Sequence, residues 1–210
     1  MRTLLQSLNL KYPIFAAPMA GVSTPELAAA VSNAGGLGAL GLGANTAEAA
    51  KKTIQTTQQL TDKPFQVNFF CHQPEAYDDV QAQAWINYLR PQFEEFEAVP
   101  PASLNKIYQS FVENDDLLNV VLETKPAAVS FHFGLPTASQ MDALKQAGII
   151  TMVSVTQLSE AIAAQKAGID VLIAQGVEAG GHRGTFNPQC DAGLTTLDLV
   201  ILLTQYVDLP

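Results

Sequence analysis

The stretch Ile149–Gly176, IITMVSVTQLSEAIAAQKAGIDVLIAQG, decides the fold of this chain. Two apolar runs within it, Ile149–Val155 and Val171–Ala174, indicate short buried strands. Between them, Thr156 opens a helical pattern that ends at Gly168, and glycine is favoured just beyond a helix end. A buried strand, a helix and a second buried strand in this order predict a βα unit of a parallel sheet.

The same alternation recurs along the whole chain. Four more apolar runs, each followed by a helical pattern, predict further strands at residues 14–17, 37–42, 65–70 and 127–133. The stretch after 65–70 is longer than a simple crossover. There, the residues that recur at helical spacing, interrupted by Pro91, are Trp85, Leu89, Phe93 and Phe96, and more helix is predicted over 104–123. The pattern therefore predicts six βα units with a helical insertion after the third strand.

Six consecutive βα units indicate the α/β class and leave two architectures open, a barrel and an open parallel sheet. A complete TIM (β/α)8 barrel takes about 250 residues and eight units. With 210 residues, the chain is expected to hold an incomplete barrel that stops before strands seven and eight. Because no linker or low-complexity segment interrupts it, we expect residues 1–210 to form one domain.

The composition narrows the classes of partner. A net charge of −9 and a pI of about 4.6 argue against nucleic acid, which needs a basic face. Two cysteines give no disulfide framework, which fits a reducing compartment. No apolar run approaches the roughly 18 residues of a membrane span. The expectation is a soluble cytoplasmic protein without membrane or nucleic-acid partners.

The segment Ala174–Gly184, AQGVEAGGHRG, follows the last predicted strand and is rich in glycine. Such a turn lets backbone N–H groups approach a ligand, and α/β proteins hold cofactors at the carboxyl ends of their strands. Two roles stay open for His182 and Arg183. They either attract an anionic substrate or form pairs within the loop.

Asn68 and His132 stand near the ends of two other predicted strands. The amide of Asn68 both donates and accepts hydrogen bonds, which suits the N–H and C=O edge of a flavin or a base, or a structural role between loops. His132 lies between Phe131 and Phe133 and is followed by Gly134. An imidazole at a strand end can take up a proton near neutral pH, whereas a histidine between apolar residues is often structural.

Two other sequence features do not predict a binding site. Gly36–Gly41 matches G-x-G-x-x-G, but it follows a helix and lies within a strand, so a dinucleotide site is not expected. Cys71 and Cys190 are far apart and lack metal-ligand spacing, so no metal site is predicted.

Four ordered motifs together resemble the nitronate monooxygenases, most closely the bacterial class I enzymes. The first is Pro18–Pro25 with Ala28–Gly38, the second is Gln66–His72, the third is Val129–Pro136 and the fourth is Ala174–Gly184. The resemblance implies an FMN-bound TIM barrel that oxidises alkyl nitronates with O₂ through a flavin semiquinone. It implies propionate 3-nitronate, a metabolic poison, as substrate, and hence a detoxifying role.

The resemblance also assigns roles to single residues. His132 matches the catalytic histidine of the family, and acts as a base only toward a neutral nitroalkane. Asn68, Gln175 and Gly180 match FMN contacts, and Gly181 and Met19 are expected to line the same site. The family's glycine-rich phosphate loops after strands seven and eight have no counterpart in these 210 residues.

Two alternatives stay open. The flavin-dependent enoyl-ACP reductases share the fold and the first motif, but their reaction needs NAD(P)H. The chain could also be a non-catalytic remnant that binds a ligand or forms a homo-oligomer through its open sheet edges.

Overall fold

The computed structural model describes residues 3–74 and 76–210. The chain divides into two compact units, one made of Met1–Gln73 with Tyr108–Pro210 and the other of Pro74–Ile107. The larger unit carries the sheet and all the site residues predicted from the sequence. None of the helices in the described residues is long and apolar enough to cross a membrane.

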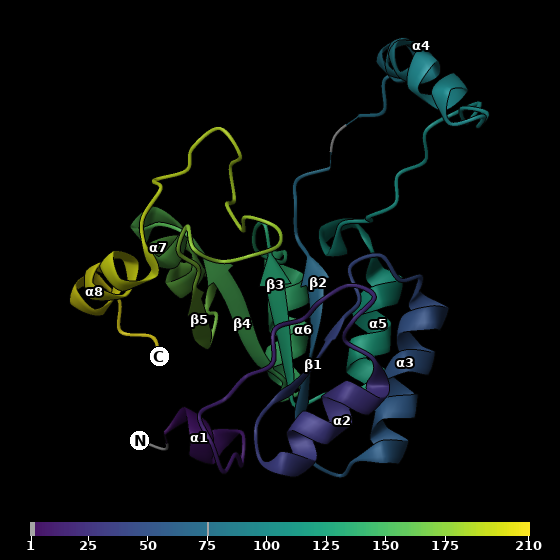
Figure 1. Ribbon diagram of the computed structural model, residues 1–210. Coiled ribbons are helices and arrows are strands. Elements are labelled where there is room, and N and C mark those ends of the chain that lie inside the picture. Colours follow the sequence, from purple (N-terminus) through teal and green to yellow (C-terminus); the bar gives the residue numbers. More distant parts are fainter. Residues whose placement is uncertain (1–2, 75) are drawn as a thin grey trace. The chain divides into compact units, whose positions relative to one another are not determined.

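A parallel sheet forms the centre of the larger unit (Figure 1). Its strands are β1 (Gly38–Gly41), β2 (Phe65–Phe70), β3 (Ala128–His132), β4 (Ile150–Val155) and β5 (Val171–Ala174). They lie in the order β1-β2-β3-β4-β5, so each strand pairs with the next one along the chain. A doubly wound sheet reverses its strand order, whereas a TIM barrel does not. This order confirms the prediction of an incomplete barrel of the TIM type.

Helices cover one face of this sheet. They are α2 (Pro25–Ala34), α3 (Ala47–Leu60), α5 (Asp115–Thr124), α6 (Ala138–Gln146), α7 (Leu158–Ala167) and α8 (Thr196–Tyr206). Successive side chains of a strand point to opposite faces, so alternate residues such as Val67 and Phe69 face the helices. These residues, with Val129, Phe131 and Val153, belong to the main hydrophobic core and are at most 1% exposed.

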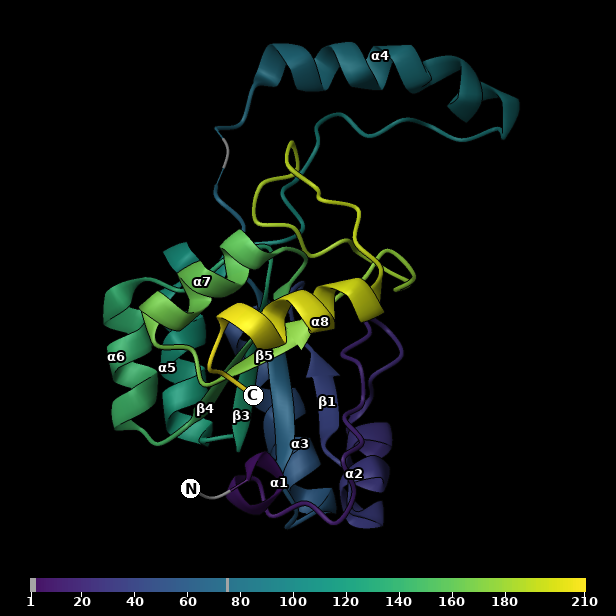
Figure 2. The same ribbon diagram turned by 90° about the vertical axis from the view of Figure 1, so that its left-hand side faces the viewer.

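The other face of the sheet is polar near the carboxyl ends and apolar near the amino ends. The polar part carries Asn68 and Ser130, which are buried, and the half-buried His132. Gln66, also buried, lies on the same face near the amino end of β2, in register with Ala128. Toward the amino ends, Met152 packs with Leu8, just after the short helix α1 (Leu4–Ser7). Figures 1 and 2 both place α1 at the amino ends of the strands and the segment between β5 and α8 at the opposite end. Apolar side chains therefore fill the interior at the amino ends of the strands, and polar side chains line it toward the carboxyl ends.

Local sequence signals account for the helix ends. Thr24, Thr46, Thr137 and Thr195 are N-caps whose hydroxyls accept from backbone N–H groups of the first turn. The α2 helix ends at Gly35, whose φ of 101° needs a glycine.

The first predicted strand, residues 14–17, is wrong as a strand. Only an isolated bridge between Phe15 and Leu37 forms there. The bonds Ala16 N–H to Leu37 O (2.8 Å) and Leu37 N–H to Ile14 O (2.9 Å) hold it beside β1. Proline lacks an N–H, and Pro13 and Pro18 flank this run, so a longer ladder cannot form. Within residues 3–74 and 76–210, the structure has five strands and a bridge where six strands were predicted.

The helix predicted over 104–123 is shorter than expected. Residues 104–110 are irregular, and a 3-10 turn η1 (Phe111–Glu113) precedes α5. The Ser110 hydroxyl caps η1 and also donates to His72 O at 2.7 Å. The Asn114 side chain then accepts from Leu117 N–H at 3.0 Å and starts α5. Two side-chain caps so close together divide what apolar spacing alone predicts as one helix.

The smaller unit contains the predicted helical insertion, α4 (Asp79–Glu95). Asp78 caps it by accepting from Val80 N–H and Gln81 N–H. Pro91 lies inside the helix and does not end it, contrary to the expected interruption. Proline removes a backbone hydrogen bond in a helix interior, but the remaining turns continue past it.

Candidate functional site

His132 ends β3 at the carboxyl edge of the sheet, in register with Phe70 of β2. The chain then turns sharply, because Phe133 has a φ of 69° and Gly134 a φ of 154°. A Cβ at Gly134 would lie 2.5 Å from Cys71 O, so this position needs a glycine. The turn holds the backbone of His132 firmly, and Cys71 N–H donates to His132 O at 2.8 Å.

The imidazole of His132 contacts the loop that follows β5. Its Nε2 lies 3.1 Å from the backbone oxygen of His182. A Cβ at Gly184 would lie 2.7 Å from His132 Cε1, so the backbone there lies directly against the ring. Burial lowers the pKa of His132 below its usual value, because a charged imidazole loses hydration there. The ring is therefore neutral at pH 7.

Gln175 connects the end of β5 to the same loop through both ends of its carboxamide. Nε2 donates to His182 O at 3.0 Å, and Oε1 accepts from Gly184 N–H at 2.7 Å. The backbone oxygen of His182 thus accepts from both predicted site residues, Gln175 and His132. Sequence reasoning placed these two residues at one site, and the structure brings them together.

Asn68 lies on the same face of the sheet but does not contact His132. Its side chain is 6% exposed and Nδ2 donates to Ser130 O (3.1 Å) and Ser130 Oγ (3.0 Å) on the neighbouring strand. Ser130 is two residues before His132, so both side chains lie on one face of β3. Asn68 therefore lies one layer below His132 along the barrel interior.

The remaining predicted site residues surround this arrangement without direct side-chain contacts to it. Met19 is 42% exposed, and its backbone packs against Gly41, the register partner of Asn68. Gly180 and Gly181 lie in open space, with no atom within 4 Å of an added Cβ. A side chain at either position would therefore meet open space.

An aromatic cluster at the site was not predicted. The ring of Phe70 lies 4.9 Å from Phe133, 5.3 Å from Tyr108 and 5.7 Å from His182, measured between centroids. Phe70 also lies 6.2 Å from His132. The signal available in the sequence was the aromatic end of β2, Phe69-Phe70. For Tyr108 the sequence held no such signal, because it reaches the site from an irregular segment 38 residues after Phe70.

Arg183 is engaged inside the loop. Nε and Nη2 donate to the carboxylate of Asp191 at 2.8 and 2.9 Å, and Nη1 donates to Gln175 O at 2.5 Å. This bidentate pair holds the pKa of Asp191 at about 2, well below its ordinary range. Of the two roles open for Arg183, the structure shows pairing within the loop.

Two carboxylates form hydrogen bonds that connect the loop 175–195 to α7 and α8. Glu178 accepts from Thr196 N–H and Thr196 Oγ1 at the start of α8. Glu160, which is 4% exposed, accepts from Thr156 N–H (2.7 Å) and from Phe186 N–H (2.8 Å). The loop 175–195 is thus a folded structure with its own hydrogen bonds.

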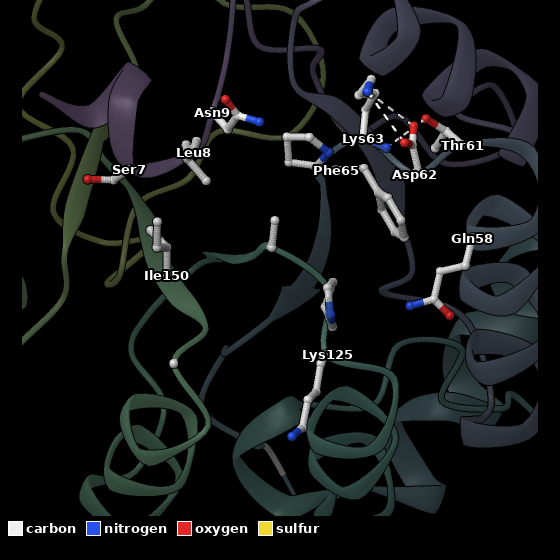
Figure 3. A pocket seen from close by; sticks show the side chains of 14 residues that line it. Ser7, Leu8, Asn9, Gln58, Thr61, Asp62, Lys63, Phe65, Lys125 and Ile150 are labelled. Atoms are coloured by element: carbon white, nitrogen blue, oxygen red, sulfur yellow. Dashed lines mark hydrogen bonds and ion pairs between the residues drawn. The ribbon is translucent and has the colours of Figure 1, made fainter.

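A separate cavity of about 580 Å³ lies at the opposite end of the strands (Figure 3). Phe65 and Ile150, the first residues of β2 and β4, line it together with Leu8, Lys63 and Lys125. It is an open depression at the amino ends, away from His132. TIM barrels carry their chemistry at the carboxyl ends, so this cavity is not the candidate site.

Comparison with known proteins places this geometry in a family. The family model for nitronate monooxygenase matches residues 2–210. The chain is 53% identical over 210 residues to a nitronate monooxygenase of Paraburkholderia phytofirmans, covering 100% of this chain and 57% of that protein. It is 51% identical over 204 residues to one of Pseudomonas aeruginosa, covering 97% and 58%.

Solved structures agree with the sequence matches. A nitroalkane oxidase from Streptomyces ansochromogenes superimposes with a TM-score of 0.85 at 39% identity, covering 96% of this chain and 57% of that one. FabK from Thermotoga maritima superimposes with a TM-score of 0.70 at 32% identity, covering 100% and 53%. The chain thus spans between half and three fifths of the length of these relatives. Since the matched family model covers nearly all of it, the chain belongs to the nitronate monooxygenase family.

Proposed function

We propose that the protein takes part in FMN-dependent oxidation of alkyl nitronates by O₂, with propionate 3-nitronate as the substrate and detoxification as the role. One observation carries the proposal. The backbone oxygen of His182 joins His132 and Gln175 at the carboxyl edge of a barrel-type sheet, where this fold performs its chemistry.

The residues present fit a flavin. The buried Oε1 of Gln66, on the sheet face that also carries Asn68, has no hydrogen-bond partner among the described residues. A buried acceptor without a partner is costly, so a ligand donor at this face is favourable. We propose that Asn68, Gln175, Gly180, Gly181 and Met19 hold FMN. When bound, FMN supplies the acceptor for electrons from the nitronate and passes them to O₂.

His132 supplies proton chemistry and orientation. Because the ring is neutral at pH 7, it can accept the α-proton of a neutral nitroalkane, whose C–H electron pair stays on the resulting nitronate. A nitronate that arrives as an anion needs no base. Toward that substrate, the His132 ring contributes to orientation and not to proton transfer.

The test is made on the purified chain. We expect a yellow protein with a flavin spectrum, and O₂ uptake on addition of propionate 3-nitronate. A preparation that stays colourless with added FMN would favour the non-catalytic remnant. Rapid anaerobic bleaching of the flavin by NADPH would favour the enoyl-ACP reductase alternative.

His132→Asn separates the two roles of the histidine. We expect this variant to lose turnover of neutral nitroethane by about 10²–10⁴-fold, the usual contribution of a general base. Turnover of the pre-formed ethyl nitronate should fall far less, and O₂ uptake measures both. Equal losses on the two substrates would remove the base assignment.

A further inference from the structure

The hydrogen bond between His132 and the loop has a defined direction. A backbone oxygen only accepts, so the His132 Nε2 that lies 3.1 Å from His182 O must carry the proton. A neutral imidazole has a single N–H, so its other nitrogen, Nδ1, then holds a free lone pair. Among the described residues, Nδ1 has no hydrogen-bond partner.

The position of this backbone oxygen is set by Gln175. Its N–H end donates to His182 O and its oxygen end accepts from Gly184 N–H, so it spans the three-residue segment that faces the ring. Only a side chain with both a donor and an acceptor at its tip makes both bonds. The main chain of Gln175 is itself held by Arg183 Nη1.

Packing keeps the ring in one orientation. Gly184 lies against Cε1 and Nε2 on one side, and the ring of Phe133 lies 4.6 Å away between centroids. Turning the imidazole over would place Cε1 opposite His182 O and break the hydrogen bond. The ring orientation and the tautomer are therefore fixed by the same loop segment.

We propose that the loop after β5 fixes His132 in the tautomer with the proton on Nε2, which leaves Nδ1 as the atom that accepts a proton from substrate, and that Gln175 is the positioning residue for this arrangement. The catalytic use of Nδ1 rests on the proposed function, whereas the tautomer does not. In the proton step, the substrate C–H bond breaks, an Nδ1–H bond forms and the electron pair remains on the nitronate. Gln175 acts here through His132, in addition to its proposed contact with FMN.

The experiment is long-range ¹H–¹⁵N NMR of the full chain labelled at histidine, at a pH above the pKa of His132. The His132→Asn variant identifies the signals of His132 among the three histidines. We expect a protonated Nε2 and an unprotonated Nδ1. In Gln175→Ala, we expect averaged shifts of the two nitrogens, because both tautomers become populated once His182 O is released.

Gln165→Ala is the matched control. Gln165 also accepts from a backbone N–H, that of Asp208, and none of the side-chain hydrogen bonds of the described residues links it to the loop 175–195. In Gln165→Ala, the ¹⁵N chemical shifts of His132 should equal those of the unchanged chain. A proton on Nδ1 in the unchanged chain would overturn the proposal, and so would an unaltered tautomer in a folded Gln175→Ala. The NMR shifts report the tautomer and not turnover. The tautomer can therefore be determined even if the purified chain does not oxidise nitronates.

Discussion

At the residue scale, two glycines of the same loop stand in different surroundings. A Cβ at Gly184 would press on the His132 ring at 2.7 Å, whereas a Cβ at Gly180 would meet nothing within 4 Å. The sequence shows both as members of one glycine-rich run. Only Gly184 is required by close packing, and its requirement comes from a histidine fifty-two positions earlier in the numbering.

Gly184→Ala should therefore destabilise the protein where Gly180→Ala does not. The added methyl must displace the His132 ring or the loop, and such overpacking costs about 1–3 kcal/mol. Urea unfolding measures this as a lower midpoint. Gly180→Ala is the control and should lie within about 0.5 kcal/mol of the unchanged chain. Equal midpoints for both variants would contradict the close packing of Gly184 on His132.

At the element scale, the loop 175–195 is organised by polar side chains that reach its backbone. Glu160 of α7 accepts from Phe186 N–H, Glu178 accepts from the start of α8, and Arg183 binds Asp191. Apolar periodicity predicts helices and strands but contains no information on such bonds, since each depends on which backbone groups lie nearby. This is why the position of the loop was predictable and its internal structure was not.

Glu160→Gln tests the connection between α7 and the loop. The amide keeps the size of the side chain but replaces an acceptor oxygen with an N–H₂ group that faces the donors Thr156 N–H or Phe186 N–H. A buried unsatisfied donor costs about 1–3 kcal/mol, measured as a lower urea midpoint. Glu48→Gln, at an exposed position in the first turn of α3, should cost less than about 1 kcal/mol. Similar costs at both positions would argue against the role of Glu160.

The Arg183–Asp191 pair predicts a pH dependence. Because the folded pKa of Asp191 is lowered from 3.8 to about 2, the pair contributes stability that is complete above pH 3.8 and is lost as the pH falls through about 2. In thermal unfolding between these pH values, Asp191→Asn should show a smaller pH-dependent loss than the unchanged chain. Parallel pH profiles would contradict a paired Asp191 in the folded protein.

At the scale of the whole molecule, the interior face of the sheet has an apolar part and a polar part. Met152, Leu8 and Val171 form an apolar cluster toward the amino ends, and His132 lies at the carboxyl edge, with Asn68 one layer below it. The predicted strands placed Met152 and His132 on neighbouring strands, but not Leu8 beneath them. Leu8 directly follows α1, a four-residue helix that is too short to give a periodic signal.

Met152→Ala measures how much this apolar layer stabilises the larger unit. Met152 is fully buried, and removal of a buried methionine side chain costs about 2–5 kcal/mol. Met19→Ala is the matched control, because Met19 is 42% exposed and should cost less than about 1 kcal/mol. Chemical unfolding followed by circular dichroism gives both values. A small effect at Met152 would contradict a packed layer at the amino ends.

The sequence by itself determined the βα alternation and the positions of Asn68, His132 and Gln175 near strand ends, because these depend on neighbours within a few residues. Tertiary structure alone decided that residues 14–17 form a bridge and not a strand, that Tyr108 and Phe70 join His182, and that Arg183 pairs with Asp191. Each of these depends on groups that are brought together only when parallel strands align their carboxyl ends. The physical reason is that hydrogen bonds and ring contacts act over a few ångströms of space, whatever the separation along the chain.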